Sequence, residues 1–116
     1  MVKYQWTIFI ADLNPVIGSE QAGKRPVLVI SDEVVNQTLP ILTVLPLTSY
    51  KGRKVYPNEY LLSKSDSGLL KDSIVMAHQI RTISRKRLIT ATGEITNNVI
   101  KEKIKSSIRF QLDLEK

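Results

Sequence analysis

Short apolar stretches separated by turn residues make up the first three quarters of the chain, and this pattern constrains its fold most strongly. Trp6–Ile10 and Pro26–Ile30 are rich in β-branched and aromatic residues and are shorter than typical helices. Polar residues, glycines and prolines separate such stretches, as expected for loops between strands. A mainly β domain is therefore predicted.

Six strands are predicted in chain order. They are Trp6–Ile10, Pro26–Ile30, Ile41–Thr48, Glu59–Leu62, Asp72–Arg81 and Leu88–Thr92. The polar stretch Ser31–Asn36 is expected to be a connection, and Ser65–Gly68 a turn. Because proline has no backbone N–H, Pro46 predicts either an edge strand or a bend.

Only the last segment has the periodicity of a helix. From Thr96 onward, Ile100, Ile104, Ile108 and Leu112 recur every fourth residue and form one apolar stripe. Thr96 is the expected N-cap. We expect the stripe to cover an open face of the sheet and the helix lysines to face solvent. The predicted architecture is α+β and mainly β, a small, strongly curved barrel with a C-terminal helix.

The chain has 116 residues, the usual size of one compact domain, so 1–116 is predicted to be a single domain. It contains no cysteine, which excludes disulfides, thiolate nucleophiles and cysteine-based metal sites. The apolar run Trp6–Ala11 is too short for a signal-peptide core or a membrane span. We therefore expect a cytoplasmic protein with no membrane partner.

Charge favours a polyanionic partner such as nucleic acid, because 17 Lys and Arg against 11 Asp and Glu give a net charge of +6. The single histidine and the lack of an acidic cluster predict no metal, and no cofactor is expected. Gly18 and Gly23 frame only a superficial phosphate loop, since Arg25 stands where Ser or Thr would hold magnesium. A nucleotide-binding fold is not expected.

Polar side chains at the ends of three predicted strands are the candidates for chemistry. They are Glu20, Gln21, Lys24, Arg25, Thr48, Ser49 and His78. The run GSEQAGKRPVLVIS at Gly18–Ser31 closely resembles the signature of the MazF/PemK family of bacterial toxin endoribonucleases. Three more blocks resemble the family in order and spacing, namely Val44–Ser49, Gly68–Ser73 and Gln79–Leu88.

This resemblance implies an SH3-like barrel of the PemK/CcdB kind, a homodimer and an acidic antitoxin partner. It also implies metal-independent, sequence-specific cleavage of single-stranded RNA, with mRNA as the target and inhibited translation and growth as the result. Such enzymes are expected to use the 2′-hydroxyl of the substrate as nucleophile. The implied products are a 2′,3′-cyclic phosphate and a 5′-hydroxyl.

The resemblance also implies roles for individual residues. Arg25 matches the family's catalytic arginine, and a guanidinium stays protonated and grips two phosphate oxygens. Thr48 matches the second catalytic position, where its hydroxyl holds the scissile phosphate; the alternative is a strand-end threonine bonded to its own backbone. Glu20 is a candidate general base or a partner that orients Arg25, with an exposed loop carboxylate as the alternative.

His78 has two interpretations. Histidine suits proton transfer near neutral pH, and some relatives carry an acidic residue at the matching position. Met76 replaces the arginine found two residues earlier in some relatives, so an arginine–acid pair is not available here. Alternation along a strand would place His78 on the same face as Ile74 and Ile80, which favours packing.

A surface for RNA is predicted around these residues. Its members are Ser19, Gln21, Lys24, Ser49, Lys51, Arg53, Lys54, Gln79 and Arg81. The basic loop Lys51–Lys54, near Tyr50 and Tyr56, combines charge with aromatic rings, although an ordinary solvated loop has the same composition. A phosphate track could be extended by Arg81, Arg85, Lys86 and Arg87; the alternative is that one or more of them pair on the surface with Asp72 or Glu94.

Two other functions are compatible with this sequence. A CcdB-like toxin that binds a topoisomerase would share the fold, cleave no RNA and be indifferent to the loss of Arg25. A nucleic-acid-binding barrel without catalysis would show salt-sensitive affinity for RNA and give no product. The block Glu20–Arg25 favours the nuclease.

Overall fold

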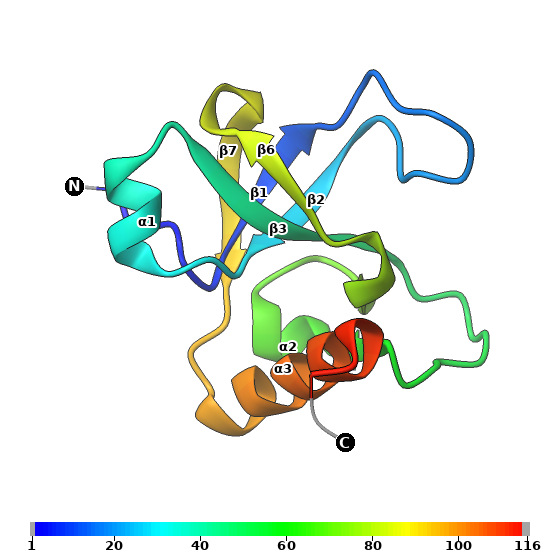
Figure 1. Cartoon of the computed structure of the whole chain (residues 1–116). Coiled ribbons are helices and arrows are strands. Elements are labelled where there is room, and N and C mark those ends of the chain that lie inside the picture. Colours follow the sequence, from blue (N-terminus) through cyan, green and yellow to red (C-terminus); the bar gives the residue numbers. More distant parts are fainter. Residues whose placement is uncertain (1, 115–116) are drawn as a thin grey trace.

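Seven strands, three helices and two 3₁₀ turns make up the computed structural model, which describes residues 2–114 (Figure 1). The strands are β1 (Thr7–Asp12), β2 (Lys24–Val29), β3 (Ile41–Ser49), β4 (Glu59–Leu62), β5 (Ser73–Met76), β6 (Arg81–Ser84) and β7 (Leu88–Glu94). The helices are α1 (Glu33–Thr38), α2 (Lys64–Ser67) and α3 (Asn98–Leu112), and the 3₁₀ turns are η1 (Ala77–Gln79) and η2 (Arg85–Arg87). The mainly β class with a C-terminal helix is confirmed.

The strands form one antiparallel sheet in the order β4-β5-β3-β2-β1-β7, and β6 also pairs with β3. Within the described residues β4 and β7 are the two ends of this path and do not pair with each other. The expected barrel is therefore an open sheet, and the word barrel describes it only loosely.

Pro46 lies inside the central strand β3, so the predicted edge position is wrong. Residues 41–44 pair with β6 and residues 47–49 pair with β5. Between these two stretches, Pro46 pairs only with Val27 of β2. The missing N–H of proline is tolerated because β3 changes partners there.

The core consists of two apolar clusters, and α3 contributes to one of them. Ile100 and Ile104 are buried with Trp6, Ile8 and other sheet residues. Figure 1 shows α3 lying below the sheet. Ile108 packs against the same cluster, whereas Leu112 is 46% exposed, so the last residue of the predicted stripe does not join the core.

The termini of the two longer helices differ from the sequence-based expectation. Asn97, not Thr96, caps α3, because its side chain accepts hydrogen bonds from the N–H groups of Val99 (2.8 Å) and Ile100 (3.2 Å). The stretch predicted to be a connection contains the start of α1, capped by Asp32. Such a short helix shows no apolar period in the sequence.

Lys103 and Lys105 are exposed on α3, as expected for its lysines, whereas Lys101 is half-buried. Lys101 and Lys105 place their ammonium groups 5.6 and 5.9 Å from the ring centre of Trp6. Both therefore also lie over an aromatic ring.

The predicted strand Asp72–Arg81 is two strands separated by η1. β5 ends at Met76, and the N–H of Ile80 bonds to the carbonyl of Ala77 before β6 begins at Arg81. His78 therefore lies on a turn, and the argument from strand alternation is wrong for it.

The predicted turn at residues 65–68 contains most of α2. Gly68 follows this helix in a left-handed conformation with φ of 79°, which glycine adopts without a steric penalty.

Packing of α3 gives a stability prediction. Ile104→Ala should lower the free energy of unfolding by about 2–5 kcal/mol, because it removes a fully buried side chain and leaves a cavity. Val99→Ala on the same helix is the control; its side chain is 64% exposed and its effect should stay within about 0.5 kcal/mol. Urea unfolding at one protein concentration measures both, and equal losses would contradict the assigned packing.

Candidate active site

Arg25 and Thr48, the two principal catalytic candidates, line one cavity of about 330 Å³. Its lining residues are Arg25, Pro26, Leu47, Thr48, Ser49, Lys51 and Ser73. The β2–β3 pairing explains the meeting of the first two, because Val27 pairs with Pro46 and, beyond that pair, Arg25 reaches the carbonyl of Leu47, the residue before Thr48. This lining contains two cations and no carboxylate, which suits an anionic ligand.

The guanidinium of Arg25 is held by its own loop and by β3. Its Nε donates to the carbonyl of Ala22 (2.8 Å) and its Nη1 to the carbonyl of Leu47 (3.2 Å). With the Gln21 amide oriented so that its oxygen faces the donors, that oxygen lies 2.6 Å from Nη2, 2.7 Å from Nη1 and 3.1 Å from Nε. Burial lowers the pKa of Arg25 from its ordinary value, and the group remains charged.

Thr48 is half-buried in β3, where it pairs with Ile74 of β5. Within residues 2–114 its hydroxyl makes no hydrogen bond, so the backbone contact considered as an alternative is not present. This hydroxyl is available to a ligand in the cavity.

The loop between β1 and β2 is closed at its base. The N–H of Leu13 bonds to the carbonyl of Gly23 (3.0 Å), and the N–H of Gly23 bonds to the side chain of Asn14 (3.2 Å). The carboxylate of Glu20 accepts from the N–H of Ile17 (2.6 Å). The expectation that Glu20 orients Arg25 is therefore wrong, because Gln21 makes that contact.

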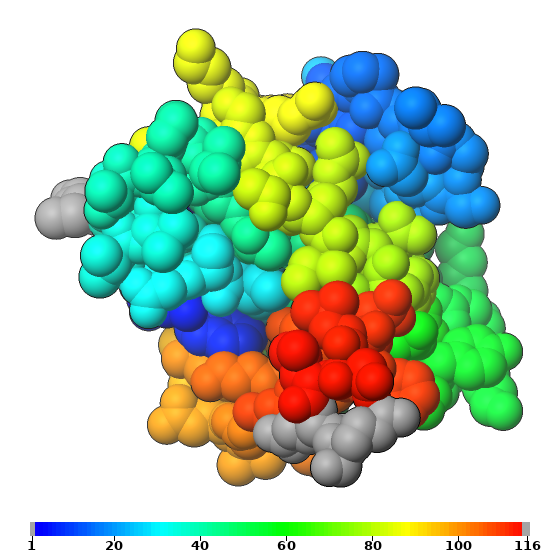
Figure 2. All heavy atoms as spheres, in the orientation of Figure 1, coloured from blue at the N-terminus to red at the C-terminus, as the bar shows by residue number. Residues whose placement is uncertain are grey.

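Gln79 ties this loop to η1. Its Nε2 donates to the carbonyl of Ser19 (3.2 Å), and its Oε1 accepts from the N–H of Gln21 (3.0 Å). Figure 2 shows the yellow-green surface around η1 directly beside the blue surface of the β1–β2 loop.

Three of the predicted track arginines contact backbone carbonyls. Arg81 donates to Leu13 (3.3 Å), and Arg87 donates to the carbonyls of Asp12 (3.1 Å) and Asn14. Arg81 and Arg87 thus hold the base of the β1–β2 loop through these carbonyls.

Arg85 instead donates to the carbonyl of Leu39 (2.8 Å) and lies over the ring of Tyr4. Among the described residues, no basic side chain of this stretch forms an ion pair with Asp72 or Glu94. The pairing proposed for them is wrong.

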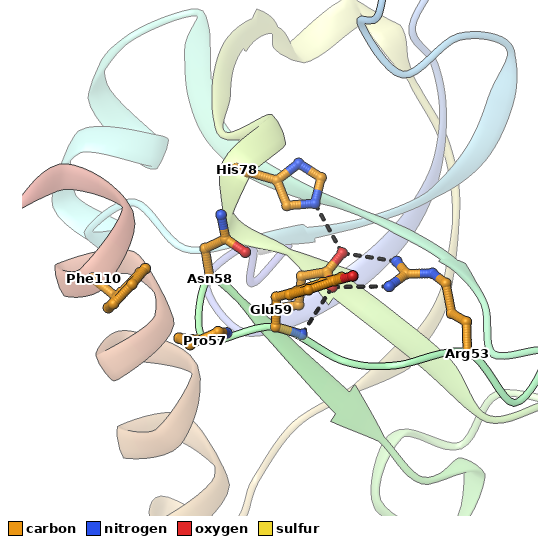
Figure 3. Close-up of a pocket in the computed structure, with 7 residues that line it drawn as sticks. Arg53, Pro57, Asn58, Glu59, His78 and Phe110 are labelled. Carbon is orange, nitrogen blue, oxygen red and sulfur yellow. Dashed lines mark hydrogen bonds and ion pairs between the residues drawn. The ribbon is translucent and has the colours of Figure 1, made fainter.

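His78 belongs to a second cluster, centred on Glu59 (Figure 3). Its Nε2 lies 2.9 Å from Glu59 Oε2, and Arg53 contacts both carboxylate oxygens at 2.9 and 2.8 Å. The Glu59 side chain is only 3% exposed and also accepts from the N–H of Tyr56 (3.2 Å). Hydrogen bonds from Arg53 above all, and then from His78 and Tyr56, lower the pKa of Glu59 to about 2 against the opposing effect of burial.

This cluster borders a separate cavity of about 660 Å³. The cavity is lined by Arg53, Tyr56, Pro57, Asn58, Glu59, His78 and Phe110. Neither His78 nor Arg53 lines the cavity of Arg25 and Thr48. The predicted constellation therefore divides between two sites.

The basic loop contributes to both sites. Lys51 lines the Arg25 cavity, whereas Lys54 lies over the ring of Tyr56, 5.4 Å from its centre. Ser49 is an exposed member of the Arg25 cavity lining, and Lys24 is exposed beside Arg25 at the start of β2.

Sequence reasoning missed Glu59 and the backbone acceptors around Arg25. The carbonyls of Ala22 and Leu47 carry no signal in residue identity. The one sequence signal for a buried Glu59 is a possible cationic partner, Arg53, six residues earlier.

Neither a membrane-spanning helix nor a metal-binding cluster is present in residues 2–114. No described helix is both long and apolar enough to cross a membrane. No group of three or more histidine, aspartate and glutamate side chains in this range lies together as ligands for a metal ion.

A family model described as the PemK-like, MazF-like toxin of type II toxin-antitoxin systems matches residues 4–112. The chain therefore belongs to this family. It is 33% identical over 114 residues to Endoribonuclease EndoA of Bacillus subtilis strain 168, spanning 98% of this chain and 97% of that relative. It is 34% identical over 107 residues to Endoribonuclease MazF of Staphylococcus saprophyticus, spanning 92% of this chain and 88% of that relative.

The fold also matches solved structures. MazF from Deinococcus radiodurans superposes with a TM-score of 0.80 at 25% identity, over 97% of this chain and 98% of that one. The expected MazF-like fold is confirmed.

The Glu59 cluster gives a pH prediction. Because the pKa of Glu59 falls from 4.5 to about 2 on folding, its contribution is full above pH 4.5 and is lost as the pH falls toward 2. This pKa shift contributes roughly 3 kcal/mol to the free energy of unfolding at neutral pH. The difference in free energy of unfolding between wild type and Glu59→Gln should therefore shrink from pH 7 to pH 3, as measured by urea unfolding.

Glu102→Gln is the control for this measurement. Glu102 is exposed on α3 and pairs with Arg109 and Lys105, so its replacement should cost no more than about 1 kcal/mol. A pH-independent difference for Glu59→Gln would contradict a carboxylate stabilised by these partners.

Proposed function

We propose that this chain is a metal-independent, sequence-specific endoribonuclease toxin that cleaves single-stranded RNA. The observation that carries the proposal is the shared cavity of Arg25 and Thr48, whose lining has two cations and no carboxylate. Membership of the PemK-like, MazF-like toxin family and similarity to two named endoribonucleases support it.

The proposed reaction is an internal transfer at phosphorus. The 2′-oxygen of the RNA loses its proton and forms a bond to the adjacent phosphorus, while the bond from phosphorus to the 5′-oxygen breaks and that oxygen gains a proton. The products are a 2′,3′-cyclic phosphate and a 5′-hydroxyl, and no water is consumed in this step.

Arg25 and Thr48 act on the phosphate. The guanidinium, already oriented by two carbonyls, stabilises the additional negative charge of the phosphorane. The Thr48 hydroxyl donates to a nonbridging oxygen and holds the phosphate against Arg25.

Proton transfer is not assigned to either candidate by this geometry. Glu20 bonds to the backbone of its own loop, and His78 bonds to Glu59 beside the other cavity. For both residues, proton transfer stays a prediction.

The proposed partners follow from family and charge. A type II toxin pairs with an antitoxin, and a chain of net charge +6 favours an acidic one. We also propose a homodimer, a single toxin domain over 1–116, and a cytoplasmic site of action on mRNA.

Cleavage of a long mixed-sequence RNA in excess EDTA tests the activity. Wild type should cut at one short recurring sequence and leave 5′-hydroxyl ends. Arg25→Ala and Thr48→Ala should each lower the rate by about 10²–10³-fold, because each removes a group that stabilises the transition state. Mapping of the new 5′ ends and their phosphorylation by a kinase measure the outcome.

Lys103→Ala is the control, because this exposed lysine lies on α3 outside the cavity and its loss should leave the rate unchanged. Intact RNA with folded wild-type protein would overturn the proposal. That result would favour a topoisomerase-binding toxin or an inactive RNA-binding protein.

Lys51 should contact an RNA phosphate. In the slowly cleaving Thr48→Ala background, adding Lys51→Ala should reduce the slope of log affinity against log salt by about 0.7, the value for one phosphate contact on a single strand. Fluorescence anisotropy at several salt concentrations measures the slope, with Lys103→Ala in the same background as the matched control. Equal slopes for all three proteins would show that Lys51 makes no such contact.

A further inference from the structure

We infer that Gln79 is a positioning residue that acts on the Arg25 guanidinium through the β1–β2 loop, rather than by contacting RNA. This inference rests on the proposed nuclease function, because it concerns the geometry of the same site. It adds a role for a residue outside the cavity, since Gln79 is not among the residues that line it.

The place of Gln79 in the fold is set by the break between β5 and β6. β5 ends at Met76 because residues 47–49 of β3 pair with it, whereas residues 41–44 pair with β6. The chain covers the gap with the 3₁₀ turn η1, whose last residue is Gln79. The turn brings this side chain to the loop, 58 positions away from Gln21 in sequence.

Both ends of the Gln79 amide are bonded to the loop backbone. Oε1 accepts from the N–H of Gln21, and Nε2 donates to the carbonyl of Ser19. A side chain that bonds on both sides of Glu20 fixes the orientation of two peptide groups at once. The same bonds occupy the amide's acceptor and one of its two donors, which an edge-on contact with a base would need.

The fixed segment leads directly to Arg25. In the amide orientation described above, Gln21 places its side-chain oxygen against all three guanidinium nitrogens, and the next carbonyl, that of Ala22, accepts from Arg25 Nε. Two of the three groups that hold the guanidinium therefore come from the segment that Gln79 holds. The third, the carbonyl of Leu47, belongs to β3 and is independent of it.

Loss of Gln79 should therefore loosen the guanidinium without removing it. Misplacement of a catalytic group by about 1 Å lowers rates by up to about 100-fold while leaving substrate binding intact. We expect a lower kcat with an unchanged KM, because Lys51 and the other residues that contact the RNA still bind its phosphates.

The test compares Gln79→Ala and Gln79→Met with wild type on a short RNA that contains the mapped cleavage sequence. Both variants should lower kcat by about 10-fold or more, leave KM within about twofold and cut at the same sequence. Methionine keeps the length of the side chain without its polar atoms. Equal losses in the two variants therefore assign the effect to the hydrogen bonds rather than to packing.

Gln37→Ala is the matched control. Gln37 also makes two side-chain hydrogen bonds, to the carbonyl of Val2 and to Glu33, but it lies on α1. Its kcat should equal that of wild type. A loss in this variant as large as that in Gln79→Ala would overturn the inference, because it would show a general effect of destabilisation.

A second measurement does not depend on activity. In Gln79→Ala, hydrogen exchange at the backbone N–H of Gln21 and at the Arg25 Nε–H should be about 10-fold or more faster than in wild type, as followed by NMR. Unchanged exchange at both groups would overturn the inference even if the nuclease proposal stands. If wild type cleaves RNA and Gln79→Ala shows a raised KM or a new cleavage sequence at normal kcat, then Gln79 reads RNA, and the positioning role is wrong.

Discussion

The pairing of β3 with three other strands is the constraint on which the rest of the structure depends. On one side its pairing with β2 brings Arg25 and Thr48 to the same cavity. On the other side the change from β6 to β5 leaves Pro46 unpaired there and requires the turn η1. The same strand thus brings together Arg25 and Thr48 of the candidate active site and determines where Gln79 and His78 lie.

Much of this arrangement follows from local sequence. The β-branched stretches predicted most strands, and the isoleucine period predicted α3, because burial of one face determines both patterns. The paired catalytic candidates Arg25 and Thr48 came from the family signature, and the structure places them in one cavity.

The rest depends on contacts that sequence patterns do not encode. The end of β5 is set by its partner strand, so the apolar residues at 74–77 and 80 give no sign of the break that removes His78 from a strand face. Competition between Thr96 and Asn97 for the cap is decided by which side chain reaches the first N–H groups. In the sequence Glu59 is indistinguishable from a surface acid, and only the structure shows its contacts with Arg53 and His78.

Two of the three acceptors that hold the Arg25 guanidinium are backbone carbonyls, those of Ala22 and Leu47. A carbonyl is present whatever the side chain, so exchange of the exposed Ala22 for another residue leaves its acceptor in place. Residue 22 can therefore change its side chain without removing an acceptor of the Arg25 guanidinium. The position of the guanidinium is in this way separated from the identity of the side chain at residue 22.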